Sequence, residues 1–287
     1  MESRALRESV PVIVGRALAE DAAAADATSL AVVPPDARAR AVLRAKQSGV
    51  LSGCEYAAAA FRLCDPGVQL QWLAQDGQAL NPGQILLEAT GTARGLLAAE
   101  RTALNFLQRL SGIASLTAVA VTAAGSLQVL DTRKTTPGLR DAEKAAVRHG
   151  GGINHRRDLD DQILLKENHF ALSGLSYDAT IQAARRAANG RAVGAEARNL
   201  AEAEMALESG ADYVLLDNFS PDELLKAASA LRRRFPRAVL EASGGLRADA
   251  LARLASIGLT RVSLGALTHS APALDLSLLI EPDPCPR

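Results

Sequence analysis

The stretch YVLLD, residues Tyr213–Asp217, is a short apolar run that ends on a charged side chain, and it typifies the second half of the chain. Five comparable apolar runs occur there: QVLD (128–131), ILLK (163–166), VGAE (193–196), VLE (239–241) and RVSLG (261–265). Amphipathic stretches typical of helices separate most of them. Strands that alternate with helices in this way predict parallel βα units.

Charged side chains close five of these predicted strands: they are Asp131, Lys166, Glu196, Asp217 and Glu241. In an α/β barrel the carboxyl ends of the strands meet on the face that carries the active site. The second half is therefore expected to be an α/β barrel with its site at this face. About six or seven repeats fall short of the usual eight, so a complete barrel is not assured and a doubly wound open sheet is the alternative.

The first hundred or so residues have a mixed pattern that predicts a small α+β domain. Apolar stretches near 40–51, 68–74 and 84–89, separated by turn signals, indicate a few antiparallel strands. A short helix is expected over 16–26, before the break at Pro34-Pro35. Apolar residues at helical spacing from Thr92 to Ala124 predict long helices, with an interruption at Ser111-Gly112.

Composition restricts the partners and the compartment. The 287 residues include 32 basic and 32 acidic side chains, so the chain as a whole lacks the positive field that would attract nucleic acids or acidic membranes. Cys54, Cys64 and Cys285 are scattered and form no CxxC pair, which argues against a disulfide framework or a structural zinc site. Without a run of 18 apolar residues or a clear signal peptide, a soluble cytoplasmic protein is expected.

Cationic residues gather in three strings. In DTRKTTPG (131–138), Arg133 offers a planar fork for a carboxylate or phosphate and Lys134 a point charge. GGGINHRR (150–157) allows close backbone approach to a ligand, although a flexible turn is the more common explanation of such a string. In KENH (166–169), Lys166 follows a strand directly, where a lysine can form a Schiff base or bind an anion.

Two carboxylates and two small-residue loops complete the predicted mouth of the barrel. Glu196 and Asp217 suit sugar hydroxyls or a Mg²⁺ ion held partly through water, or else salt bridges with the nearby cations. ASGG (242–245) and SLGA (263–266) lie where late barrel loops commonly cradle a phosphate. The substrates should therefore be anionic, and one should carry a phosphate.

Seven strings together resemble the quinolinate phosphoribosyltransferase family, over residues 13 to 280. They are ERTALN (100–105), DTRKTTPGLR (131–140), GGGINHR (150–156), LKENH (165–169), LDNFS (216–220), EASGG (241–245) and GALTHS (265–270). Members transfer phosphoribosyl from phosphoribosyl pyrophosphate to quinolinate, release pyrophosphate and CO₂, and make nicotinate mononucleotide for NAD biosynthesis. The resemblance implies a glycosyltransferase that uses Mg²⁺.

The resemblance also implies an architecture: an N-terminal α/β sandwich domain over 1–112, joined by the C-terminal segment 268–287, and an incomplete, seven-stranded α/β barrel over 113–267. Family dimers are head-to-tail homodimers with shared active sites, in which the first domain of one protomer closes the barrel of the other. Two departures from the family pattern stand outside the implied contacts. Ala22–Ala25 replace frequent glycines, and His149 stands where a cysteine is frequent.

Residue roles carry over on the matching positions. Arg133, His155, Arg156 and Lys166 would line the quinolinate pocket, and Arg101 would reach in from the partner chain. Lys134 would serve phosphoribosyl pyrophosphate, and Glu196 and Asp217 would face the ribose and the Mg²⁺–pyrophosphate. The remaining implied contacts, most of them to the 5′-phosphate, are Thr132, Ser243, Gly244, Gly245, Leu264, Gly265 and Ala266. Lys134, Lys166, Glu196 and Asp217 would be the catalytic set.

Four alternatives are weighed against this interpretation. Pyrophosphorylase-like proteins linked to molybdate transport share two of the strings but lack the KENH string, which is present here at 166–169. A nicotinate phosphoribosyltransferase would bind a monocarboxylate, which does not require so many cations. A Schiff-base lyase would use Lys166, and a non-enzymatic sensor would have lost at least one of the cations or carboxylates.

Overall fold

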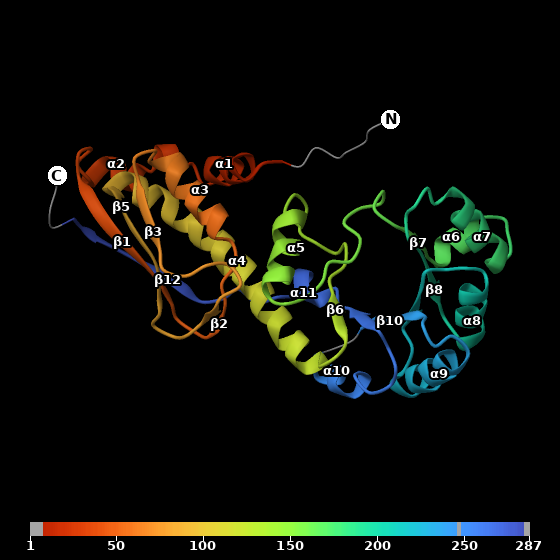
Figure 1. Ribbon diagram of the computed structural model, residues 1–287. Coiled ribbons are helices and arrows are strands. Elements are labelled where there is room, and N and C mark those ends of the chain that lie inside the picture. Colours follow the sequence, from red (N-terminus) through yellow and green to blue (C-terminus); the bar gives the residue numbers. More distant parts are fainter. Residues whose placement is uncertain (1–7, 246–247, 284–287) are drawn as a thin grey trace. The chain divides into compact units, whose positions relative to one another are not determined.

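A computed structural model describes residues 8–245 and 248–283 and divides the chain into two compact units. The first unit combines the residues up to Leu116 with Asp141–Gly150 and the residues from Ala271 onward. The second unit consists of Thr117–Arg140 and Gly151–Ser270. Each unit has its own sheet, as Figure 1 shows.

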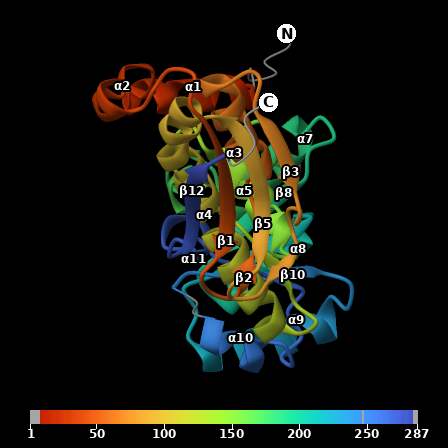
Figure 2. The same ribbon diagram turned by 90° about the vertical axis from the view of Figure 1, so that its left-hand side faces the viewer.

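The first unit is built on an antiparallel sheet with the strand order β12-β1-β5-β3 (Figure 2). Its strands are β1 (Arg38–Ala45), β3 (Gln69–Trp72), β5 (Ile85–Thr92) and β12 (Leu276–Pro282). Along β1, alternate residues such as Ala41 and Leu43 are buried, which is the two-residue period of a sheet with one face on the core. A separate pair, β2 (Gly49–Val50) and β4 (Ala79–Leu80), completes the expected antiparallel strands.

Six described helices accompany this sheet in the chain, and the helix expected over 16–26 is wrong in its bounds. The helices are α1 (Val10–Glu20), η1 (Ala23–Ala25), α2 (Ala27–Val32), α3 (Cys54–Cys64), α4 (Ala93–Ala124) and α5 (Arg140–His149). The chain leaves α1 through Ala22, whose φ of 50° is left-handed. It enters α2 at Asp26, whose carboxylate accepts hydrogen bonds from the backbone N–H groups of Thr28 and Ser29.

Helix α4 runs without the interruption expected at Ser111-Gly112. A Cβ atom on Gly112 would stand 2.0 Å from the carbonyl oxygen of Pro272, so the glycine permits close backbone packing and does not break the helix. By length and composition, α4 is the one described helix that could cross a membrane. Its side chains at Leu107, Leu110 and Ile113 are instead almost fully buried within the protein, as in a core helix.

The second unit is built on a parallel sheet with the strand order β6-β11-β10-β9-β8-β7. Its strands are β6 (Gln128–Leu130), β7 (Ile163–Leu165), β8 (Val193–Ala197), β9 (Tyr213–Asp217), β10 (Val239–Ser243) and β11 (Arg261–Ser263), which confirms the six predicted strands. Because the first strand pairs with the last, the order is that of a barrel and not of a doubly wound sheet. Ile153 adds an isolated parallel bridge to Leu130 at the β6 edge.

Helices follow the strands, as a βα barrel requires. They are α6 (Glu167–Leu172), α7 (Tyr177–Ala187), α8 (Leu200–Glu208), α9 (Pro221–Arg234), α10 (Ala248–Leu254) and α11 (Ala266–His269). The predicted start signals are confirmed: Asn199 caps α8 by accepting from the N–H of Glu202, and Ser220 forms a capping box with Glu223 at α9. The short helices after β7 and β11 begin at the face where the strands end.

The prediction that five charged residues end their strands is wrong for one of them. Asp131, Lys166, Glu196 and Asp217 lie at or within one residue of the ends of their strands. Glu241 does not, because β10 continues to Ser243 and the Glu241 side chain is fully buried inside the sheet.

Candidate active site

A cavity of about 730 Å³ opens at the carboxyl ends of the parallel strands in the second unit. The predicted site residues that line it are Thr132, Arg133, Lys134, His155, Arg156, Lys166, Glu196, Asp217, Ser243, Gly244, Gly245, Leu264, Gly265 and Ala266. Arg101 does not line it, and its exposed side chain is on α4 in the first unit. Leu164, Leu215, Asn218, Ser263 and His269 line it as well and were missed as site residues.

Two guanidinium groups in the cavity favour the binding of an anion. Arg156 is 7% exposed, and its Nη1 donates to the carbonyl of Gln162 at 3.2 Å. Burial, followed by the positive charge of Arg133, lowers the pKa of Arg156 below its ordinary value. The Nε atom of Arg133 is buried and has no hydrogen-bond partner among the described residues. A carboxylate would both pair with this donor and relieve the repulsion between the two cations.

Lysine 166 reaches across the sheet to a carboxylate. Its Nζ atom forms an ion pair with Oε1 of Glu196, which belongs to the neighbouring strand β8. Its backbone N–H donates to Nδ1 of His169 at 2.9 Å, so the KENH string starts α6 and holds the lysine at the strand end. The salt-bridge interpretation of Glu196 is therefore correct for the protein without substrate.

The other carboxylate, Asp217, is positioned by the residue that follows it. Asn218 donates from its side-chain amide to Oδ2 of Asp217 at 2.8 Å. Asn218 has a left-handed φ of 57°, and its backbone N–H donates to the carbonyl of Ser243 at 3.1 Å. These contacts join the end of β9 to the end of β10, where Gly244 and Gly245 also have positive φ values.

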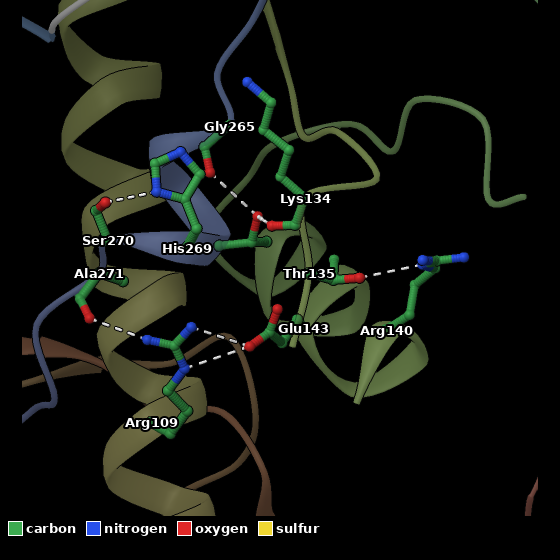
Figure 3. A network of polar contacts seen from close by, with 10 residues as sticks. Arg109, Lys134, Thr135, Arg140, Glu143, Gly265, His269, Ser270 and Ala271 are labelled. Carbon is green, nitrogen blue, oxygen red and sulfur yellow. Dashed lines mark hydrogen bonds and ion pairs between the residues drawn. The ribbon is translucent and has the colours of Figure 1, made fainter. Parts of the chain in front are cut away.

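The lysine of the first cationic string packs against the last glycine loop (Figure 3). Thr132 Oγ1 accepts from the backbone N–H of Lys134 at 3.1 Å, and the carbonyl of Lys134 accepts from Thr268 Oγ1 at 2.8 Å. A Cβ atom on Gly265 would stand 3.0 Å from Cδ of Lys134, so the glycine leaves room for the lysine. His269, bonded through Nδ1 to Ser270 Oγ at 2.6 Å, was missed although it lies in the GALTHS string.

The donor set for a divalent ion is sparse. Among the residues that the structure describes, no group of three or more His, Cys, Asp or Glu side chains is placed to hold a metal ion. Glu196 and Asp217 are the carboxylates that line the cavity. They suit an ion such as Mg²⁺ that takes most of its oxygen ligands from water and from substrate phosphates.

Family models match both parts of the chain. The model described as the N-terminal domain of quinolinate phosphoribosyl transferase matches residues 26–111, and the model of its C-terminal domain matches residues 113–279. Together they cover most of the sequence.

Individual relatives match over most of their lengths. The nicotinate-nucleotide pyrophosphorylase [carboxylating] of Rattus norvegicus is 41% identical over 94% of this chain and 90% of the rat protein. The Homo sapiens protein of the same name is 40% identical over 97% of this chain and 95% of the human one. A relative from rice, 36% identical over 94% of this chain and 77% of the rice protein, is described as chloroplastic.

A solved structure shares the fold. The nicotinate-nucleotide pyrophosphorylase from Francisella tularensis is 34% identical, superposes with a TM-score of 0.88, and is matched over 98% of this chain and 100% of that chain. The antiparallel sheet of the first unit and the parallel sheet of the second are therefore shared with this solved structure.

Proposed function

The chain belongs to the quinolinate phosphoribosyltransferase family, and we propose from this premise how its cavity carries out the family reaction. The enzyme joins quinolinate to phosphoribosyl pyrophosphate, releases pyrophosphate and CO₂, and makes nicotinate mononucleotide for NAD synthesis. It is a nicotinate-nucleotide pyrophosphorylase of the carboxylating type, as its relatives are named.

The observation that carries this function is the pair of poorly solvated guanidinium groups of Arg133 and Arg156. Quinolinate bears two carboxylates that are ionised at neutral pH. A planar guanidinium matches a carboxylate with two parallel N–H groups, so two such groups suit a dicarboxylate. Lys166 adds a third cation, because its ammonium group can exchange Glu196 for a substrate oxygen.

The phosphoribosyl group occupies the other side of the cavity. Ser243, Gly244 and Gly245 receive the 5′-phosphate together with Gly265 and Ala266, where small residues let the phosphate approach the backbone N–H groups. Lys134, packed against Gly265, is placed to contact the same substrate. This arrangement leaves Glu196 and Asp217 for the ribose between the two anionic ends.

The carboxylates stabilise the transition state of the transfer. As pyrophosphate leaves, positive charge builds on the ribose, and the carboxylate of Asp217 or Glu196 offsets it. Lys166 neutralises Glu196 before substrate binds, and once this lysine turns to quinolinate both carboxylates can offset the developing charge. The decarboxylation that follows leaves a carbanion beside a positively charged pyridinium nitrogen, which accepts the electrons, so the protein needs no separate electron sink.

Magnesium is part of the proposal. Glu196 and Asp217 would hold Mg²⁺, partly through water, beside the pyrophosphate. The ion supplies neutralisation of the leaving group's charge. The residues' task is to keep that pyrophosphate near Lys134 and away from the quinolinate pocket.

Arg101 enters the proposal through the partner chain. Its exposed position on α4 suits a head-to-tail homodimer in which Arg101 of one protomer completes the quinolinate pocket of the other. We place the enzyme in the cytoplasm because its described cysteines, Cys54 and Cys64, are free thiols. The family does not set this compartment, since relatives include chloroplastic proteins.

The test is product formation from quinolinate, phosphoribosyl pyrophosphate and Mg²⁺, with nicotinate run in parallel. Nicotinate mononucleotide and CO₂ from quinolinate alone are expected. Turnover of nicotinate alone would contradict the dicarboxylate pocket. A folded protein that turns over neither substrate would contradict the proposal and favour the molybdate-linked relatives or a sensor.

A further inference from the structure

Two carboxylates lie buried beside the cavity without lining it. Asp131 and Glu241 are both 0% exposed, and neither has a place in the proposed chemistry. A buried charge is costly unless it is paired and hydrogen-bonded. What each of them holds therefore indicates why it is present.

Asp131 holds the loop that carries two predicted site residues. Its Oδ1 accepts from the backbone N–H of His155 at 2.8 Å, and its Oδ2 accepts from the side-chain amide of Asn154 at 2.7 Å. The next residue of that loop is Arg156. Asp131 thus fixes the backbone just before this guanidinium.

Glu241 holds the same loop through a side chain. Its Oε2 accepts from Nε of Arg261 at 2.7 Å, and its Oε1 lies 3.5 Å from Nε2 of His155. Arg261 in turn stacks on the ring of Tyr213, with its guanidinium carbon 4.3 Å from the ring centroid. Burial alone would raise the pKa of Glu241, but the neighbouring His155 side chain and the charge of Arg261 hold it below its ordinary value.

Both ring nitrogens of His155 face groups of the protein. Its Nδ1 accepts from the backbone N–H of Arg156 at 2.7 Å, and a backbone N–H is always the donor. The ring proton is therefore on Nε2, which faces Glu241. The backbone thus occupies Nδ1, and Nε2 faces Glu241 at 3.5 Å.

We infer that Glu241 is a positioning residue for the dicarboxylate pocket: it fixes the His155 ring, which fixes the backbone of Arg156. The inference rests on the proposed function, since it assigns Arg156 to quinolinate. It also revises the expected role of His155, from a ligand of quinolinate to a link between Glu241 and Arg156. Although Glu241 lies on β10, which leads into the 5′-phosphate loop at Ser243, its carboxylate contacts His155 and Arg261, so the effect should fall on quinolinate.

The main test is Glu241→Gln, which keeps the volume and removes the charge. The amide cannot accept on both sides, so either Arg261 or His155 faces a second donor. A shift of Arg156 by a fraction of an ångström should raise the KM for quinolinate about tenfold. The KM for phosphoribosyl pyrophosphate should stay within about twofold of wild type, because that substrate does not contact Arg156.

A matched control lies in the first unit. Glu143 is also 0% exposed and accepts from Nη2 of Arg109 at 3.0 Å (Figure 3). Glu143→Gln should lower the Tm as Glu241→Gln does, and leave the KM for quinolinate unchanged. A structural role for Glu241 would make the two variants behave alike.

A second variant covers the case in which Glu241→Gln does not fold. Replacing both partners, Glu241→Met with Arg261→Met, removes this buried ion pair as a whole and is compatible with a stable core. It still removes the acceptor facing His155, so the same selective rise in the quinolinate KM is expected. Equal changes in both KM values, or an unchanged quinolinate KM, would overturn the inference. Wild-type protein that fails to turn over quinolinate would instead overturn the proposed function.

Discussion

A Cβ atom on Gly244 would stand 2.1 Å from Oδ1 of Asn218, so the ends of β9 and β10 fit together because residue 244 is a glycine. The same asparagine donates to Asp217, and Gly244 belongs to the proposed phosphate cradle. The carboxylate and the cradle are thus set by one close contact.

Gly244→Ala should therefore impair catalysis. The new methyl displaces Asn218 and releases Asp217, and a φ of 93° strains any residue with a Cβ. We expect kcat/KM to fall by about a hundredfold, the cost of a misplacement near 1 Å.

Gly190→Ala is the matched control. Gly190 has a φ of 83° and no atom within 4 Å of its would-be Cβ. It should lose about 1 kcal/mol of unfolding free energy from backbone strain, with kcat/KM unchanged. Equal kinetic losses in the two variants would contradict the role of the Asn218 contact.

Removing Arg133, whose Nε atom has no hydrogen-bond partner among the described residues, tests the quinolinate pocket directly. Arg133→Ala should weaken quinolinate binding by about 2–4 kcal/mol, because charge-assisted hydrogen bonds are lost. Isothermal titration measures this, with Arg191→Ala as control because Arg191 pairs with Asp160 outside the cavity. Unchanged affinity in a folded Arg133→Ala variant would remove Arg133 from the pocket.

The strand-end charges show how far the sequence alone leads. The ends of parallel strands meet at one face, so residues such as Lys166 and Asp217 could be assigned to one cavity from spacing alone. Glu241 could not, because its assignment depends on where β10 ends. Two more residues, to Ser243, place Glu241 on the same face of the strand but one layer deeper in the barrel.

Close contacts between distant segments were also beyond the sequence. The sequence suggests a helix break at Gly112. The glycine is instead needed for close packing against the carbonyl of Pro272, which is far along the chain. Asn218 and His269 were missed for the same cause: an amide or imidazole that follows a predicted strand becomes a cavity residue only once the loops and helices are placed.

Ala22 offers a test of a departure from the family pattern. It stands where members often carry glycine, and its φ of 50° is a conformation that costs alanine about 1 kcal/mol. Ala22→Gly should raise the unfolding free energy by about that amount. Ala24→Gly, inside η1 at ordinary φ, should lower it, and a fall for both variants would contradict the strain.

Asp65 predicts an acid-dependent part of the stability. Burial would raise the pKa of Asp65, but hydrogen bonds from the backbone N–H groups of Thr92 and Gly67 and from the Thr92 hydroxyl keep it below its ordinary value. A lowered folded-state pKa contributes stability that is complete above the unfolded pKa of about 4 and is lost as pH falls through the folded one.

Asp65→Asn should consequently lower the Tm at pH 7 and shrink its difference from wild type as the pH falls below about 4. Thermal unfolding across that range measures the difference. A gap that persists unchanged at low pH would show that the side chain acts through shape and not through charge.

The shared active site is tested by mixing subunits. Arg101→Ala and Lys166→Ala should each be inactive as homodimers, because every site then lacks one cation. In a mixed dimer, one site combines both lesions and the other has neither. Mixing the two variants should therefore restore activity, up to about half of the sites in each heterodimer.

Two variants of the barrel unit, Arg133→Ala and Lys166→Ala, should not complement, since each chain then carries a lesion in its own barrel. Failure of the first pair to recover, with subunit exchange verified by differently tagged chains, would contradict a site completed by the partner's Arg101.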